Sequence, residues 1–107
     1  MRAKTETNKT TDALAILDQM AGESAELRRL TEEARINAAV AQLIYAARNK
    51  AGLSQAALAD RIGTKQSVIS RLEDADYEGH SLAMLRKIAG ALNQRVEIRF
   101  IPIRRSA

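Results

Sequence analysis

Apolar residues recur every three or four positions along most of the chain, which is the spacing of amphipathic helices. The pattern is clearest from residue 37 to residue 94, where Gly52, Gly63 and the polar residues 75–80 separate four helical stretches. We expect the apolar positions of these stretches to pack into one core. The predicted core residues are Val40, Leu43, Ile44, Ala47, Leu53, Leu58, Ala59, Ile62, Ile69, Leu72, Leu82, Leu85, Ile88, Ala89 and Leu92.

Two of these helices, residues 54–62 and 65–74, meet at Gly63. A tight corner between helices needs a residue that tolerates positive φ, and a β-branched side chain would be strained there. Ser54 is suited to capping the first of the two helices. The stretch therefore predicts a helix-turn-helix, whose second helix lies in the major groove of DNA.

The chain before residue 37 has a looser pattern. Residues 1–10 are polar and are predicted to be disordered. Gly22 is predicted to end a short helix, and Ser24 to begin the next. No breaker follows between residues 25 and 50, so one long helix and two abutting helices both fit. We call residues 1–36 the arm, and expect it to be flexible or helical, packed on its own domain or folded on a partner.

After residue 94 the period changes from helical to alternating. Val96, Ile98 and Phe100 alternate with charged residues, which predicts a strand that ends at Pro102. Everything else reads as helix, and an isolated strand would leave its backbone groups unpaired. We therefore expect residues 95–107 to form a dimerisation strand and basic tail, paired antiparallel with a second copy about a two-fold axis. A strand that folds back or stays frayed is the alternative.

Charge divides the chain in the same way. Residues 1–34 have five Lys/Arg and seven Asp/Glu, a net charge of −2, whereas residues 35–107 have twelve and six, a net charge of +6. A basic body suits a domain that binds phosphates. The chain has only three aromatic residues, which argues against binding of single-stranded nucleic acid.

Composition also excludes several chemistries. The chain has no cysteine, and its one histidine, His80, lies in a polar connector. We therefore expect no disulfide, no metal site, no cofactor and no catalytic triad, so the protein is not predicted to be an enzyme. No apolar run is long enough for a membrane span, and the first residues lack the apolar core of a signal peptide, which predicts a cytoplasmic protein.

The corner and its flanks resemble the Xre/Cro/cI family of helix-turn-helix DNA-binding proteins, from about residue 38 to residue 93. The residues that carry the resemblance are Gln55, Leu58-Ala59, Gly63, Gln66-Ser67, Ile69-Ser70 and Leu72-Glu73. Within this family, the segments 72–82 and 95–100 are most similar to HigA-type antitoxins and related stand-alone regulators. The resemblance implies an all-α, lambda-repressor-like helix-turn-helix domain at residues 37–94, with the arm before it.

The resemblance also implies which residues contact DNA. Gln66, Ser67 and Arg71 would read base edges, with Lys65 and Ser70 at the margin. An amide suits adenine and a guanidinium suits guanine, because each can form two hydrogen bonds with that base.

Other residues would contact phosphate groups. Gln55 resembles the glutamine with which the family clamps a phosphate at a helix N-terminus. Ser54 could add a hydroxyl donor. Arg48 and Glu73 occupy positions that form an ion pair in some phage repressors, which would leave Arg48 with a mainly structural role and a second one near phosphate.

Three functions remain open from the sequence. The first is a homodimeric repressor of a pseudo-palindromic operator on double-stranded DNA that is also the autoregulating antitoxin of a HigB-like toxin. The second is a stand-alone regulator without a toxin, and the third is a module that binds only proteins. Steep salt dependence of DNA binding would exclude the third.

Overall fold

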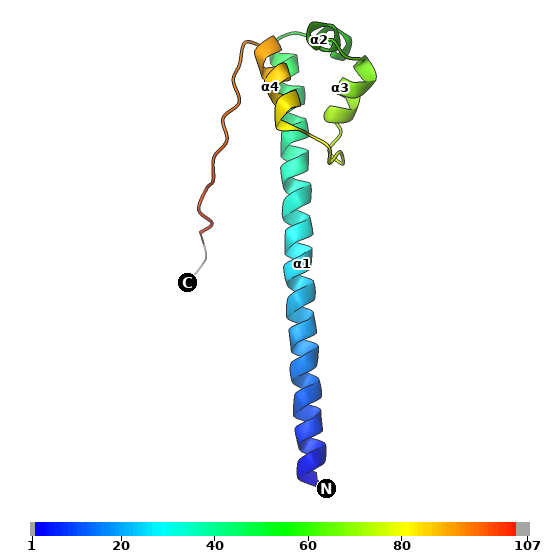
Figure 1. The fold of residues 1–107 in the computed structure, drawn as a ribbon, viewed down its shortest axis with the longest axis vertical. Helices are drawn as coiled ribbons and strands as arrows, with labels where there is room; N and C mark the ends of the chain where they lie inside the picture. Colours follow the sequence, from blue (N-terminus) through cyan, green and yellow to red (C-terminus); the bar gives the residue numbers. More distant parts are fainter. Residues whose placement is uncertain (1, 105–107) are drawn as a thin grey trace. The chain divides into compact units, whose positions relative to one another are not determined.

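The structure is a computed structural model that describes residues 2–104, with side chains from residue 12 onward. The described residues form the four helices α1 (Arg2–Lys50), α2 (Gln55–Ile62), α3 (Gln66–Leu72) and α4 (Leu82–Ala91), in the order drawn in Figure 1. The predicted all-α class is confirmed for this part of the chain. Backbone contacts divide the protein into two compact units, Met1–Ile36 and Asn37–Ala107, and α1 contributes residues to both.

The first unit is helical, and two predictions for it are wrong. The sequence predicts disorder for residues 1–10 and a helix end at Gly22, but α1 begins at Arg2 and continues through Gly22. A glycine in a helix costs about 1 kcal/mol relative to alanine without obstructing the helical backbone. Arg29 pairs with Glu33 at 2.6 Å, four residues further along the same helix, and such pairs support it locally.

The large apolar side chains of the first unit are between 47% and 66% exposed. They are Leu14, Ile16, Leu17, Met20, Leu27, Leu30 and Ile36. The helical spacing that the sequence shows is therefore present, but these side chains are not buried within the described chain.

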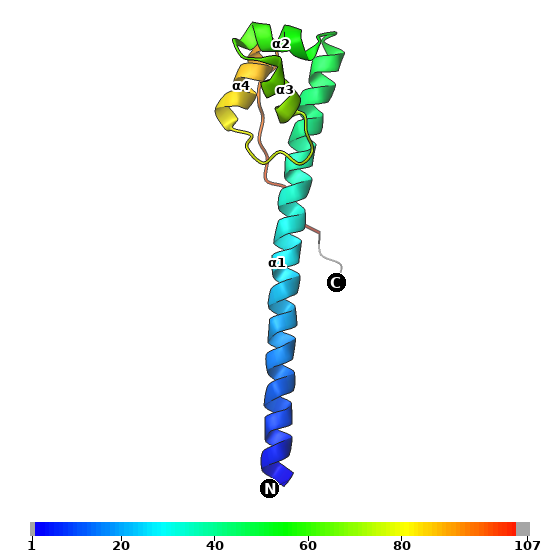
Figure 2. The ribbon, with the colours of Figure 1, turned by 90° about the vertical axis from the view of Figure 1, so that its right-hand side faces the viewer.

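In the second unit, α2, α3 and α4 gather around the last turns of α1 (Figure 2). Leu58 of α2 and Ile69 of α3 are the largest fully buried side chains and lie at the centre of one core. The other buried residues of this core are Ile44, Ala59, Leu72 and Ile88, and the side chains packed against it are Val40, Ile62, Val68, Tyr77, Met84, Leu85, Ala91 and Leu92. All of these except Val68, Tyr77, Met84 and Ala91 belong to the predicted core.

Two predicted core residues, Leu43 and Leu82, are instead exposed. On α1 the buried positions are Ala41, Ile44 and Arg48, which lie three and four residues apart. The buried stripe is thus rotated toward Arg48, because this arginine has a partner inside the domain.

No strand occurs in the described part of the C-terminal segment, where residues 95–104 follow α4 without regular secondary structure. Val96 is half-buried, whereas the side chain of Phe100 is fully exposed, at 101%. A strand that pairs across a homodimer needs a second copy, so this pairing stays a prediction. Arg105 lies outside the described residues.

Candidate nucleic-acid interface

The corner between α2 and α3 is built around Gly63, as predicted. Gly63 has φ 72° and ψ 37°, in the left-handed region. Its N–H donates to the carbonyl of Asp60 at 3.3 Å, and the N–H of Thr64 donates to the carbonyl of Ala59 at 2.9 Å. These two bonds form a Schellman motif, which satisfies the last carbonyls of α2 and fixes the direction in which the chain leaves it.

The start of α2 is held by Ser54. Its Oγ accepts a hydrogen bond of 3.0 Å from the N–H of Ala57, so the predicted cap is confirmed. The side chain is exposed, and the hydroxyl hydrogen is not used in this bond. Capping and donation to a phosphate are therefore compatible at Ser54.

Helix α3 has one apolar side and one polar side. Ile69 and Leu72 are buried in the core, and Val68 is half-buried beside them. Because residues four apart lie next to each other on a helix, the polar positions form one continuous exposed face. This face, which we call the reading face, consists of Gln66, Ser67, Ser70 and Arg71, with Lys65 exposed just before it.

The helix is slightly shorter than the predicted 65–74, since it begins at Gln66 and ends at Leu72. Lys65 has extended backbone angles, φ −98° and ψ 151°, and no side chain caps the helix there. Within the described chain, the reading face forms no intramolecular hydrogen bond or ion pair through its side chains. The structure thus brings all five predicted base-reading residues to one exposed surface.

An ion pair between Arg48 and Glu73 lies beneath the corner. Nε of Arg48 donates to Oε2 of Glu73 at 2.6 Å, and Nη2 donates to Oε1 at 2.9 Å. The two side chains are only 8% and 4% exposed. Hydrogen bonding to the carboxylate raises the pKa of Arg48 and outweighs the opposing effect of desolvation. The predicted ion pair is confirmed, and it ties the end of α1 to the end of α3.

Three further contacts surround this pair. Nη1 of Arg48 donates to the carbonyl of Leu53 at 2.7 Å, and the amide of Gln55 donates to Glu73 at 3.2 Å. The guanidinium also lies 5.5 Å from the ring centre of Tyr45. Two of the three predicted phosphate contacts, Arg48 and Gln55, therefore donate to groups inside the domain as well.

His80 is predicted to be an ordinary hydrogen-bonded residue of the polar connector, and the structure identifies its partner. Its Nε2 lies 2.6 Å from the carbonyl of Leu72 and donates to it, because a carbonyl can only accept. This bond satisfies a carbonyl at the end of α3 that has no partner within the helix. The ring of Tyr77 meets the imidazole edge-on, with centres 5.0 Å apart. Apolar periodicity does not predict this contact, because its two residues lie eight positions apart and one of them is in the connector.

Among the described residues, no group of three or more His, Asp or Glu side chains is arranged to hold a metal ion. No helix in the described range combines the length and apolar character that crossing a membrane requires.

A left-handed glycine corner and a second helix with one polar, exposed side define a helix-turn-helix domain, the fold of a large class of DNA-binding transcription regulators. Residues 44–98, just over half of the chain, match the sequence model of the family described as Helix-turn-helix, of the Xre/lambda-repressor type. The chain therefore belongs to this family. Searches of curated proteins and of solved structures gave no match.

Proposed function

We propose that the protein is a sequence-specific transcriptional repressor that places α3 in the major groove of double-stranded DNA. The observation that carries the proposal is the reading face, where polar side chains on one side of α3 are exposed while Ile69 and Leu72 anchor the other side in the core. A helix held in this way can present side chains to base edges without unfolding any part of the domain. A repressor acts by occupying a promoter, so no chemical step is needed.

The residues of the reading face have different roles in this proposal. The amide of Gln66 donates to and accepts from adenine, and the guanidinium of Arg71 donates twice to guanine. A bidentate contact of this kind discriminates against a wrong base by about 1–3 kcal/mol. Ser67 makes a single hydrogen bond to a base, while Lys65 and Ser70 contact the margin of the site.

Contacts to phosphates hold α3 in register. Ser54 and Gln55 lie at the N-terminus of α2, where free N–H groups and the positive end of the helix dipole favour an anion. The hydroxyl of Ser54 and the second amide hydrogen of Gln55 are the donors. Arg48 contributes mainly by supporting the domain, and its remaining N–H groups donate to the phosphate backbone of the DNA. Such contacts orient the protein but do not read sequence.

The functional unit in this proposal is a homodimer. Val96, Ile98 and Phe100 are apolar at alternate positions of the C-terminal segment, and the last two are exposed in the single chain. Antiparallel pairing with the same segment of a second copy would bury them and relate two reading faces by a two-fold axis. The operator is then a pseudo-palindrome with half-sites about 34 Å apart.

We further propose that the protein is the autoregulating antitoxin of a HigB-like toxin. The arm supports this over a stand-alone regulator of the same family, because it has seven large apolar side chains that are about half exposed. Contiguous exposed apolar side chains are typical of surfaces that bind another protein. Co-purification from the native host, with and without residues 1–36, tests for such a partner.

The DNA-binding proposal is tested by selecting bound duplexes from a randomised pool with the full chain and with its Arg71→Ala variant. We expect the variant to lose preference at one base position in each half-site, at a cost of about 1–3 kcal/mol for that base. Lys87→Ala, which removes an exposed cation from α4, is the matched control and should leave the selected sequence unchanged.

The same samples give the salt dependence of binding. Affinity should fall steeply with salt, with a slope set by the number of phosphates neutralised. An unchanged selected sequence for Arg71→Ala would remove Arg71 from the base-reading residues. Absence of salt-dependent binding to any duplex would refute the proposal as a whole and favour a module that binds only proteins.

A further inference from the structure

The sequence of the C-terminal segment also indicates the register in which two copies would pair. We propose that the two copies pair with Ile98 on the two-fold axis, and that Phe100 of each copy covers a groove beside α4 of the other. This inference rests on the homodimer proposed above and specifies how that dimer is built.

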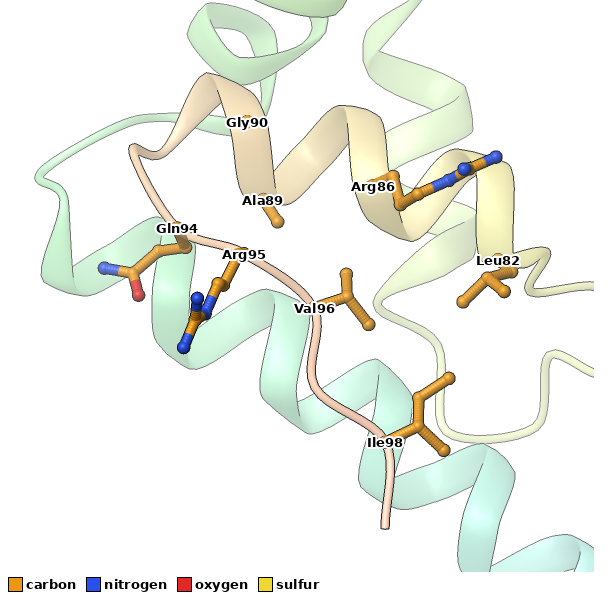
Figure 3. Close-up of a pocket in the computed structure, with 8 residues that line it drawn as sticks. All are labelled: Leu82, Arg86, Ala89, Gly90, Gln94, Arg95, Val96 and Ile98. Carbon is orange, nitrogen blue, oxygen red and sulfur yellow. The ribbon is translucent and has the colours of Figure 1, made fainter.

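The groove lies between α4 and the segment that follows it (Figure 3). Its volume is about 450 Å³. Its apolar part is lined by Leu82, Ala89 and Gly90 from α4 and by Val96 and Ile98 from the segment, and Arg86, Gln94 and Arg95 complete its lining. In Figure 3 the side chains of Val96 and Ile98 point to the same side, toward α4. One face of the segment is thus directed at an apolar groove that the single chain leaves open.

The chain also provides an apolar side chain without a site of its own. Phe100 continues the alternation of Val96 and Ile98, but its side chain is completely exposed. Single exposed apolar residues are common on protein surfaces, but Ile101 and Ile103 nearby are also exposed. An exposed apolar cluster next to an open apolar groove fits an interface between copies of the chain.

Symmetry leaves few registers for the pairing. In an antiparallel pair about a two-fold axis, residue i faces residue 2k − i of the other copy, where k is the residue on the axis. Only a whole-number k keeps the apolar side chains of both strands on one face of the sheet, because alternate residues point to opposite faces. For a strand from Arg95 to Ile101, which Pro102 bounds, five or more residues of each copy are paired only when the axis lies at Glu97, Ile98 or Arg99.

Charge selects one of these registers. With the axis at Glu97, two glutamates face each other and Arg95 faces Arg99. With the axis at Arg99, two arginines face each other. With the axis at Ile98, Glu97 of each copy faces Arg99 of the other, so two opposite-charge pairs form on the solvent side. Like charges directly opposite are destabilising and opposite charges are stabilising.

The same register explains the apolar face. With Ile98 on the axis, Val96 of each copy lies opposite Phe100 of the other. Because paired residues project to the same face, the aromatic ring is directed to the side on which Val96 lines the groove. The second copy thereby supplies the cover that the single chain lacks. In the single chain, Arg99 instead pairs with its own Glu97 at 3.2 Å, on the exposed surface.

The register can be tested by disulfide formation, because the natural chain has no cysteine. Single variants of the full chain, Glu97→Cys, Ile98→Cys and Arg99→Cys, are oxidised under mild conditions. Directly opposite residues have Cα atoms about 4.5–5.5 Å apart, within the range of a disulfide. Diagonal neighbours are about 7–8 Å apart, at or beyond its limit. Asp60→Cys, an exposed position on α2, measures linkage by random collision.

We expect Ile98→Cys to convert to covalent dimer and the other three variants to remain at the collision level. Fastest linkage of Glu97→Cys or Arg99→Cys would overturn the register but leave the homodimer standing. If sedimentation of the natural chain shows only monomer, the homodimer itself fails. DNA binding, measured separately on the same natural chain, reports on the reading face and is unaffected by either result.

A second measurement tests the role of Phe100. Phe100→Ala should raise the dissociation constant of the dimer at least about tenfold, since each copy loses a buried aromatic side chain. Ile103→Ala, at another exposed apolar position but beyond the strand, is the control and should change this dissociation constant little. Equal effects of the two substitutions would contradict the proposed contact of Phe100 with the groove.

Discussion

Removing Glu73 should destabilise the domain more than its position at the end of a short helix suggests. In the natural chain its carboxylate accepts two hydrogen bonds from Arg48 and one from Gln55. The side chain of Arg48 is only 8% exposed in the natural chain. Glu73→Ala would leave its guanidinium in place, with the carbonyl of Leu53 as the one hydrogen-bond acceptor that remains in this network. A buried charge without its partner is costly.

The expected magnitude follows from comparison with other buried pairs. Breaking such a pair by removing one member costs about 3–5 kcal/mol, whereas replacing both members with apolar residues of similar volume is often nearly neutral. Glu73→Ala should therefore cost about 3 kcal/mol or more, and the double variant Arg48→Met/Glu73→Leu much less. A domain of this size loses about 4–8 °C of melting temperature per kcal/mol.

The sign of the pH dependence also follows. The ion pair raises the pKa of Arg48, so its contribution is fully present below the unfolded-state pKa of arginine and is lost only as pH rises through the higher folded-state value. Arginine is protonated in both states near neutral pH. The guanidinium therefore adds no pH dependence to stability in that range.

The assay is urea denaturation, followed by circular dichroism, of the natural chain, of Glu73→Ala, of the single variants Arg48→Met and Glu73→Leu, and of the double variant that combines these two. The coupling energy of the cycle isolates the pair. If Glu73→Ala costs less than about 1 kcal/mol, or if the double variant is as unstable as the sum of the single ones, the pair does not stabilise the domain in the way described. The double variant also tests whether Arg48 contacts phosphate, because a lost contact would reduce the salt slope of DNA binding by about 1.

Two local substitutions test how the corner is built. Ser54→Ala removes the side-chain oxygen that accepts from Ala57 and should cost about 1 kcal/mol by the same urea assay, whereas Ser54→Asp should retain the cap. Gly63→Val places a β-branched side chain at φ 72° and should cost about 1–3 kcal/mol, although nothing lies within 4 Å of the added Cβ. Wild-type stability of Gly63→Val would show that backbone strain does not fix the corner.

The corner could be predicted from sequence because its causes are local. Gly63 and Ser54 act on groups within five residues of themselves, and the apolar spacing of α2 and α3 identifies Leu58, Ile69 and Leu72 as core. The ion pair of Arg48 and Glu73 links residues 25 positions apart. It was predicted only because the chain resembles a family in which this pair occurs, since no local pattern encodes such a contact.

The errors have physical causes as well. Gly22 was predicted to end a helix, but one unfavourable residue does not outweigh good helix-forming residues on both sides. Leu43 was assigned to the core because periodicity favours the most apolar stripe. The stripe that is buried includes Arg48, whose partner in a distant helix makes burial possible. Single-sequence patterns score side chains one at a time and miss pairs that are buried together.

For exposed apolar residues, the sequence of one chain does not determine what they pack against. Periodicity shows that one face of a helix or strand is apolar. The same periodicity occurs whether that face packs on its own domain or on another molecule. In the core of the second unit this ambiguity disappears, because four helices bury each other's stripes. In the arm and at Phe100 it persists, since the side chains have the expected spacing and remain exposed. Charge is the additional constraint at the C-terminal segment: only one symmetric register places Glu97 opposite Arg99, so the partner that best fits this segment is a second copy of the chain.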